Sequence, residues 1–288
     1  MKTEHTKHQH YVPQLYLKNF TQNRNKAVVW DRVSKGYYYK KIREICYIND
    51  LYETKWVDSN PNLGKFVLDN QIERQLAELE GNAAKVIDKI IRLANEHNFV
   101  SISATEKRIL IEFITTLYLR NPYILKDIEK YYEGCENEEA VSSLIGSLNY
   151  FFTNLGIGNP KPLINHSIMS GIVNNGIEGS PFNFEFEKIS NMRMLFWYTK
   201  REKFITASFP FHINTIDGKT TDRIILPLGS QVACALFDKR IPFLNEDAVI
   251  EVQPQFVLAI NRLYLEQYPP DLARFLIAED EENIKKIL

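Results

Sequence analysis

The stretch from His8 to Phe20 reads H-Q-H-Y-V-P-Q-L-Y-L-K-N-F, and no other segment of the 288-residue chain is as dense in side chains that donate or accept hydrogen bonds. Its two imidazoles can titrate near neutral pH. Because His8 and His10 lie two residues apart, an extended backbone would place both rings on one face. This stretch is therefore the first candidate for a functional site.

The second half of the stretch has a helical pattern. Pro13 suits the first turn of a helix, so residues 13–20 are predicted to form a short helix with an apolar side. Gln14 and Lys18 would then share a face, four residues apart. Together with Asn19, they are candidates for binding a substrate.

Length and composition indicate an ordinary globular protein. Hydrophobic residues make up 44% and aromatic residues 12% of the chain, which is ample for a buried core. No apolar run is long enough to span a bilayer, and the N-terminus lacks the apolar segment of a signal peptide. We expect a cytoplasmic protein with no membrane partner. Cys46, Cys135 and Cys234 are too widely spaced to suggest a disulfide framework or a zinc site.

The charge is unevenly distributed. Residues 1–43 hold ten Lys or Arg and two acids, which gives a net charge of +8. Because the whole chain has a net charge of −1, the other 245 residues have a net charge of −9. A local basic cluster favours a phosphate-bearing partner, here nucleic acid or a nucleotide, and Arg32 is its candidate substrate-binding residue. The alternative is a solvated hairpin face docked on an acidic body.

Strand signals lie at both ends of the chain. Residues 26–32 and 37–42 are β-rich runs around the turn signal Ser34-Lys35-Gly36, which predicts a hairpin. In the final third the predicted strands are 194–199, 203–208, 223–228 and 231–237.

Segregated helices and strands predict an α+β fold, with a helix-rich first two thirds followed by an antiparallel sheet and C-terminal helices. Nothing marks a linker, so a single domain is expected. Its parts are a basic N-terminal segment and hairpin (1–43), a helical region (69–190), a sheet (194–252) and closing helices (254–288).

The clearest helix spans residues 69–95. Its apolar stripe follows three- and four-residue steps and consists of Ile72, Leu76, Leu79, Ala83, Val86, Ile87, Ile90 and Leu93. Glu73 and Glu80 are two turns apart, on nearly the same side. They are candidates for metal ligands or for an acid and base, and the alternative is a solvated edge or salt-bridge partners.

A second helix begins at Ser103, which forms a capping box with Glu106. Pro122 in Arg120-Asn121-Pro122 is expected to interrupt this helix. The interruption would present Arg120 at a defined angle. That side chain could bind a phosphate or carboxylate, or tie the interruption to an acid such as Glu112 or Glu80.

These motifs carry a family resemblance. The segment His8–Phe20 resembles the opening signature of a bacterial domain-of-unknown-function family that begins roughly His-His-Tyr-Val-Pro-Gln-Phe-Tyr-Leu-Arg-Asn-Phe. The similarity continues through the following segments: Trp30-Asp31-Arg32, the I-E-x-x-L of residues 72–76, Glu80, Arg120-Asn121-Pro122 and Pro227-Leu228. The family has no settled activity, so the resemblance implies which positions matter and raises the functional weight of Glu73 and Glu80.

One segment departs from the family. Where members tend to show a Ser-Asp-Asn-Pro-like turn after a Phe-Ile-Thr strand, this chain reads Ala207-Ser208-Phe209-Pro210 after Phe204-Ile205-Thr206. The acidic residue is absent. If that acid belongs to the family's site, this protein has lost a function or supplies the group from elsewhere.

Two chemical schemes fit these residues. In the first, His8, His10, Glu73 and Glu80 hold a divalent cation such as Mg²⁺ or Mn²⁺, which activates water against a phosphodiester. In the second, His10 is a general base without a metal, Lys18 and Arg120 stabilise the developing negative charge, and Gln14 and Asn19 orient the substrate.

Several common enzyme classes are not indicated, since the chain lacks a nucleophile elbow, HExxH, a Rossmann glycine fingerprint and the kinase motifs. The leading hypothesis is a phosphodiester hydrolase acting on nucleic acid or nucleotides, such as a nuclease-like bacterial toxin or phage-defence effector, with His10, Glu73, Glu80 and Arg120 as catalytic residues. The alternative is a non-catalytic binding or interaction module, whose polar residues bind a small ligand or build a structural network.

Overall fold

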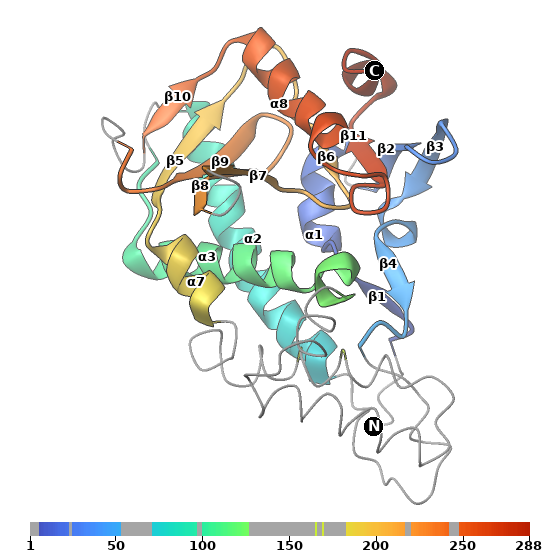
Figure 1. Cartoon of the computed structure of the whole chain (residues 1–288), viewed down its shortest axis with the longest axis horizontal. Coiled ribbons are helices and arrows are strands. Elements are labelled where there is room, and N and C mark those ends of the chain that lie inside the picture. Colours follow the sequence, from blue (N-terminus) through green and yellow to red (C-terminus); the bar gives the residue numbers. More distant parts are fainter. Residues whose placement is uncertain are drawn as a thin grey trace, which may run out of the picture.

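The computed structural model describes residues 6–22, 25–52, 71–96, 100–126, 165, 169, 183–216, 220–241 and 248–288. Within the predicted helical region of residues 69–190, the part from residue 127 to 182 lies outside these ranges apart from residues 165 and 169. Cys135 therefore lies outside the described residues as well. Figure 1 shows the arrangement of the described elements, with two larger sheets and the first helix between them. Within the described ranges, no helix has the length and apolar character needed to cross a bilayer.

The larger sheet has five strands in the order β10-β5-β9-β8-β7. In chain order these are β5 (Arg193–Tyr198), β7 (His212–Ile216), β8 (Thr220–Pro227), β9 (Val232–Phe237) and β10 (Val249–Glu251). Neighbours are antiparallel except β10 and β5, which pair in parallel. The predicted antiparallel sheet is therefore a mixed one. The reason is that the chain reverses direction between β9 and β10, and β10 pairs on the far side of β5, which is itself antiparallel to β9.

Helices cover both faces of this sheet. Helix α8 (Pro254–Glu266) packs on one face, and α2 (Gln71–Glu96), α3 (Ala104–Leu119) and α7 (Asn183–Ser190) lie on the other (Figure 1). On the α8 side, Trp197 meets Phe256 edge to face, with ring centroids 4.7 Å apart. A sheet covered on both faces has apolar residues at nearly every position, which explains the fully buried run of β9.

The second sheet joins the two ends of the chain. Its order is β3-β2-β11-β6, formed by β2 (Lys26–Asp31), β3 (Gly36–Lys41), β6 (Thr206–Ala207) and β11 (Phe275–Ala278). The predicted N-terminal hairpin is present as β2 and β3. The prediction of only helices in residues 254–288 is wrong, because β11 pairs with β2 and β6 at the centre of this sheet. The strand's Leu276, Ile277 and Ala278 are all buried, so it lacks the two-residue alternation that would have marked it as a strand.

A third, two-stranded sheet pairs β1 (His8–His10) with β4 (Tyr47–Asn49). The mixed α+β class is confirmed. A helix-rich first two thirds is not supported as predicted, since the described residues before α2 include four strands and two short 3₁₀ helices, η1 (Lys18–Phe20) and η2 (Ile42–Glu44).

The two predicted helices of the first half are confirmed. In α2 the apolar stripe is buried as expected, with Ile72, Ala83 and Ile90 at 0% exposure. At the start of α3, the Glu106 amide donates to Ser103 Oγ over 3.2 Å, and Glu106 Oε2 accepts from the Ser103 amide over 2.7 Å. Helix α3 ends at Leu119, with Arg120 as its C-cap, just before the predicted interruption at Pro122.

The signature stretch is part of the core. Its second half forms α1 (Gln14–Leu17) and η1, in which Tyr16, Leu17 and Phe20 are fully buried. The Tyr16 hydroxyl donates to the Pro227 carbonyl over 2.7 Å and lies 2.9 Å from the Thr206 hydroxyl. This single side chain therefore links the larger sheet, through β8, to the second sheet, through β6.

One buried side chain of the larger sheet lacks polar partners. His212 on β7 is 1% exposed, its ring lies 3.9 Å from that of Tyr264, and neither ring nitrogen has a hydrogen-bond partner among the described residues. Burial, followed by the charge of Arg223, lowers the pKa of His212 from 6.5 to about 3. The folded protein therefore holds this imidazole neutral at pH values where the unfolded chain would protonate it.

The protein should consequently lose stability as the pH falls from 6.5 towards 3. The pKa of His212 is lower in the folded protein than in the unfolded chain, so protonation of the unfolded chain at low pH favours unfolding. Above pH 6.5 this penalty is absent, and between pH 7.5 and pH 5 it reduces the free energy of unfolding by about 2 kcal/mol. In urea unfolding monitored by circular dichroism, the free energy of unfolding of His212→Phe should fall between pH 7.5 and pH 5 by about 2 kcal/mol less than that of the wild type. An identical loss in the wild type and the variant would contradict the assignment.

Candidate functional site

The site is built around Arg120, whose guanidinium is buried at the junction of three segments. The residue is 1% exposed. Its Nε donates to the Tyr11 carbonyl over 2.9 Å, and its Nη1 donates to Glu80 Oε1 over 2.7 Å. Of the two sequence-based alternatives for Arg120, the tie to an acid is therefore present, and the acid is Glu80; Glu112 pairs instead with Arg108.

His10 lies beside this guanidinium, at the end of β1. Burial, and then the positive charge of Arg120, lowers the pKa of His10 from 6.5 to about 4, while a backbone hydrogen bond at Arg43 opposes this shift. The imidazole is therefore neutral at physiological pH. Its Nε2 is buried and has no hydrogen-bond partner among the described residues.

Tyr52 is a further member of the cluster and contacts β1 at His10. The residue is fully buried, and its hydroxyl donates to the His10 carbonyl over 3.2 Å. Its pKa is raised well above 10, first by burial and then by the negative charge of Glu73, with Arg120 opposing. Residues of the N-terminal strand, α2 and the end of α3 thus act on one another electrostatically, and His10, Glu73, Glu80 and Arg120 all belong to this group.

The four predicted metal ligands are less well grouped. His8 is exposed and stacks on Tyr47, with ring centroids 4.3 Å apart. Among the described residues, no three or more His, Cys, Asp or Glu side chains are arranged to hold a metal ion, and this includes His8, His10, Glu73 and Glu80. Glu80 is already engaged, because its carboxylate accepts a hydrogen bond from the guanidinium of Arg120.

The predicted substrate-binding residues lie in different environments. Gln14 and Lys18 are exposed on the short helical segment. Asn19 bonds the backbone after β8. Its side-chain Nδ2 donates to the Leu228 carbonyl over 2.9 Å, and its backbone carbonyl accepts from the Ser230 amide. Arg32 is 7% exposed and donates to the carbonyls of Ala273 and Leu265. The structure does not bring Asn19 or Arg32 to the His10 and Arg120 group through any of these contacts.

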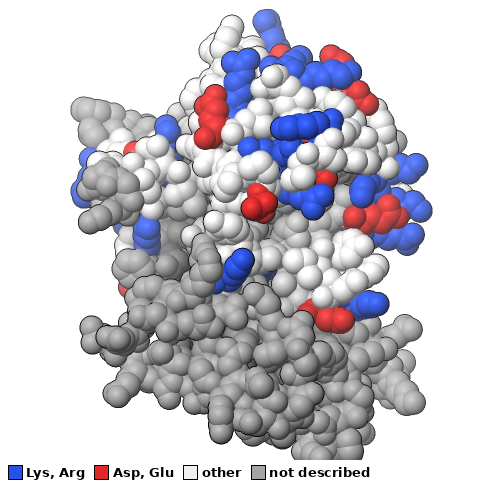
Figure 2. Space-filling model, turned by 45° about the vertical axis from the view of Figure 1, so that its right-hand side comes forward, with Lys and Arg blue, Asp and Glu red and all other residues white. Residues whose placement is uncertain are grey.

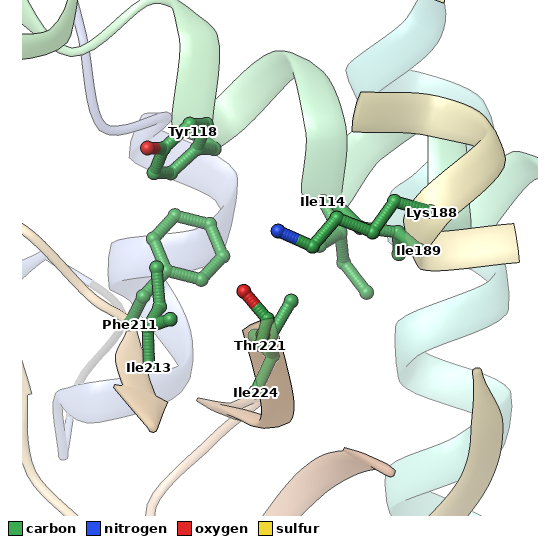
Figure 3. A pocket seen from close by; sticks show the side chains of 8 residues that line it. All are labelled: Ile114, Tyr118, Lys188, Ile189, Phe211, Ile213, Thr221 and Ile224. Atoms are coloured by element: carbon green, nitrogen blue, oxygen red, sulfur yellow. The ribbon is translucent and has the colours of Figure 1, made fainter. Parts of the chain in front are cut away.

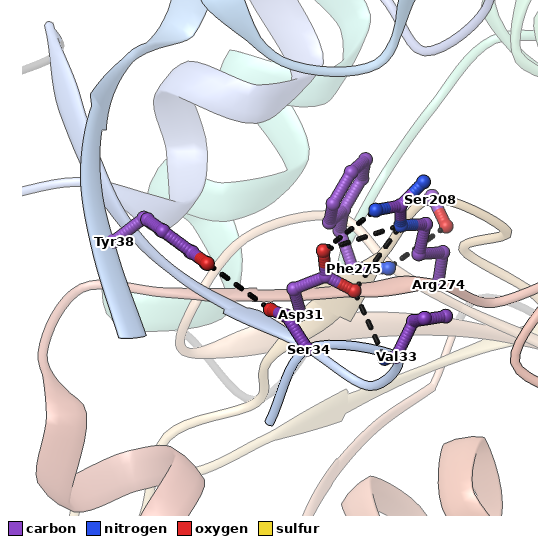
Figure 4. A network of polar contacts seen from close by, with 7 residues as sticks. All are labelled: Asp31, Val33, Ser34, Tyr38, Ser208, Arg274 and Phe275. Carbon is purple, nitrogen blue, oxygen red and sulfur yellow. Dashed lines mark hydrogen bonds and ion pairs between the residues drawn. The ribbon is translucent and has the colours of Figure 1, made fainter. Parts of the chain in front are cut away.

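A second polar network lies on the other side of Tyr11 and surrounds the segment that departs from the family. Asp31 receives Arg274 Nη2 at 2.8 Å and the Val33 amide at 2.9 Å, and the ion pair lowers the pKa of Asp31 (Figure 4). Ser208, at the position of the family's acid, accepts from the Phe275 amide through Oγ over 3.2 Å.

The Ser208 carbonyl accepts from Asn121 Nδ2 over 3.2 Å, so this segment contacts the residue next to Arg120. The segments that carry the family resemblance, around Tyr11, Asp31 and Arg120, therefore meet the departing segment around Ser208 in one region. No acid replaces the missing one within these contacts, because Asp31 is committed to Arg274.

The basic N-terminal region is only partly available for a ligand. Lys35 lies over the Trp30 ring at 5.1 Å and Lys40 over the Tyr38 ring at 5.4 Å. On the face that Figure 2 shows, Lys and Arg side chains are interspersed with Asp and Glu. That face therefore presents charges of both signs.

Sequence reasoning missed Tyr52, Arg274 and the carbonyl of Tyr11. Tyr52 lies in no periodic segment, and Arg274 lies in a region predicted to be helical. A backbone carbonyl leaves no trace in composition. Only the resemblance at Asp31 could have pointed towards the Arg274 ion pair.

Removing the carboxylate of the buried pair should destabilise the protein. Glu80→Ala leaves the guanidinium without its counter-charge and should reduce the free energy of unfolding by roughly 2 to 3 kcal/mol, below the usual value for a fully buried pair because Glu80 keeps 20% side-chain exposure. Glu78→Ala, at an exposed position on the same helix, is the matched control and should change stability by less than about 0.5 kcal/mol. Equal effects of the two substitutions in urea unfolding would refute the role of the pair.

The comparisons with known proteins agree with the resemblance. The family model described as "Protein of unknown function (DUF4238)" matches residues 8–268, which includes the whole Arg120 cluster and the segments that meet around it. No curated protein and no solved structure matches this chain. On the extent of the family match, the chain belongs to the DUF4238 family.

Proposed function

We propose that this protein binds a phosphate-bearing ligand, a nucleotide or nucleic acid, at the His10 and Arg120 cluster and hydrolyses a phosphodiester there, in the cytoplasm. A role as a bacterial toxin or phage-defence effector would follow from such a nuclease-like activity. The proposal is supported above all by two buried nitrogen atoms of neighbouring side chains that have no partner within the described residues.

These atoms are Arg120 Nη2 and His10 Nε2. Leaving a buried polar group unpaired costs about 1 to 3 kcal/mol, and more if the group is charged. A ligand oxygen beside Nη2 would accept from Arg120 and remove the cost for that nitrogen, and a water bound next to the ligand would donate to His10 Nε2. Because Glu80 pairs with Nη1 and the Tyr11 carbonyl with Nε, Nη2 is the guanidinium nitrogen left for a ligand.

The tautomer of His10 suits a proton acceptor. We place the ring proton of the neutral imidazole on Nδ1, because Nε2 has no partner among the described residues and backbone acceptors at Arg43 and His8 support the protonated ring. A proton on Nδ1 leaves the lone pair on Nε2. In the proposed reaction, Nε2 accepts a proton from water as the water oxygen attacks phosphorus. The phosphorus–oxygen bond to the leaving group breaks, the leaving oxygen takes a proton from solvent, and Arg120 offsets the developing negative charge.

The geometry favours this metal-free scheme over the metal-dependent one. His8 stacks on Tyr47, Glu80 is engaged by Arg120, and the predicted ligands are not arranged as a metal-binding group among the described residues. They would therefore have to rearrange before they could share a Mg²⁺ or Mn²⁺ ion. Where such a rearrangement occurs, the cation would supply the charge that Arg120 supplies in the metal-free scheme.

The second candidate is a non-catalytic binding or interaction module. It is favoured by one observation: Arg120 is 1% exposed and already holds Glu80 and the Tyr11 carbonyl. A closed network of this kind can serve stability and specificity of the fold, or retain a small anion, without any chemistry.

Activity should depend on His10 and not on its neighbour. We would incubate the protein with mixed single- and double-stranded DNA and RNA, with Mg²⁺, Mn²⁺ or EDTA, and compare the wild type with His10→Ala. His8→Ala is the matched control, because it removes an exposed imidazole from the same strand. Cleavage that persists in EDTA, disappears in His10→Ala and survives in His8→Ala is the expected result.

The pH profile provides an independent check. The base must be deprotonated, so the rate should rise with pH through about 4 and stay level above it. If no substrate is cleaved under any of these conditions, while His10→Ala remains folded and still alters ligand binding, the binding-module candidate replaces the hydrolase.

Anion binding can be tested without turnover. An anion beside Nη2 would offset the positive charge that lowers the pKa of His10, so inorganic phosphate should raise that pKa from about 4 in an NMR titration of the imidazole signals. The signals of the exposed His8 serve as the internal control. A His10 pKa that does not respond to phosphate would rule out an anion at this position.

A further inference from the structure

A separate cavity of about 100 Å³ lies between α3, α7 and the outer strands of the larger sheet (Figure 3). Most of its wall is apolar, and residues of α3, of α7 and of the sheet all contribute to it. Tyr118 of α3 and Phe211 beside β7 meet edge to face, with ring centroids 5.9 Å apart and an interplanar angle of 77°. Isoleucines complete the wall, among them Ile114 on α3 and Ile224 on β8. No residue of this wall belongs to the His10 and Arg120 cluster.

Two polar groups point into this apolar space. Figure 3 shows the Lys188 ammonium of α7 and the Thr221 hydroxyl of β8 directed towards the centre of the cavity. Across the described ranges, the structure gives neither side chain a hydrogen bond or an ion pair. Because the ammonium faces an apolar wall and has no acceptor among the described residues, an anionic partner there would be favourable.

We propose that this cavity is a binding site for a small carboxylic acid with a short apolar body. The carboxylate would lie between Lys188 Nζ and Thr221 Oγ1, one oxygen accepting from each. The hydrocarbon part would contact the isoleucines and the two aromatic rings. A mostly apolar wall with a few convergent polar groups is the usual composition of a small-molecule site.

The volume limits the size of the ligand. An apolar cavity of about 150 Å³ accommodates benzene, so about 100 Å³ accommodates a body of about four carbon atoms. The hydrocarbon part of isovalerate, the four carbon atoms outside its carboxylate, has this size and a branched end that matches the isoleucine wall, and the molecule carries a single negative charge. A nucleotide is too large, which separates this site from the proposed phosphodiester chemistry.

The test is titration calorimetry of the whole protein with isovalerate, compared with the uncharged isoamyl alcohol. We expect saturable binding of isovalerate and markedly weaker binding of the alcohol. Lys188→Met keeps the length of the side chain but removes its charge, and should weaken isovalerate binding about tenfold or more. Thr221→Val keeps the shape and removes the hydroxyl, and should weaken binding about threefold.

Lys239→Met, at an exposed position after β9, is the matched control and should leave the affinity unchanged. Absence of binding to the wild type at millimolar isovalerate would overturn the proposal, as would equal affinity of wild type and Lys188→Met or equal affinity for acid and alcohol. Circular dichroism of each variant verifies folding, and the Thr221 variant tests the site independently should Lys188→Met be unfolded. None of these outcomes depends on whether His10 is catalytic.

Discussion

The burial of the Arg120 charge is the constraint on which much of the structure depends. A guanidinium at 1% exposure is tolerated only where acceptors surround it, and here they come from α2, through Glu80, and from the N-terminal segment, through the Tyr11 carbonyl. Three segments far apart in the chain are thereby fixed to one another. Burial and, after it, the same charge lower the pKa of His10, so the feature that holds the segments together also affects the chemistry available at the proposed site.

The N-terminal signature combines a structural half with a chemical half. Tyr16 and Phe20 fill the space between the two larger sheets, while His10 and the Tyr11 carbonyl face Arg120. Since the two halves are joined through Pro13, docking of the short helix also positions the histidine strand. A displaced Tyr16 would therefore displace His10 as well. Residues that do not contact a ligand can for this reason be as important to the site as residues that do.

Local patterns predicted the helices of the first half well. The apolar stripe of α2 and the Ser103 capping box are encoded within a few residues, and both appear in the structure where expected. The strands at the end of the chain were harder. Strand β11 is buried on both sides and follows a helix, so its apolar run has no two-residue period and was read as helical. The parallel pairing of β10 likewise depends on which side of β5 is vacant, which is not a local property.

The sequence by itself determined the α+β class, the family, the two main helices and the set of residues worth testing, because periodicity, capping and motif spacing act over short distances. Only the tertiary structure decided how those residues are used. It paired Arg120 with Glu80 rather than Glu112, packed both His8 and His10 against the Tyr47 ring, and committed Asn19 and Arg32 to distant backbone carbonyls. The physical reason is that a buried polar group takes whichever partner the packing of remote segments brings within hydrogen-bond distance.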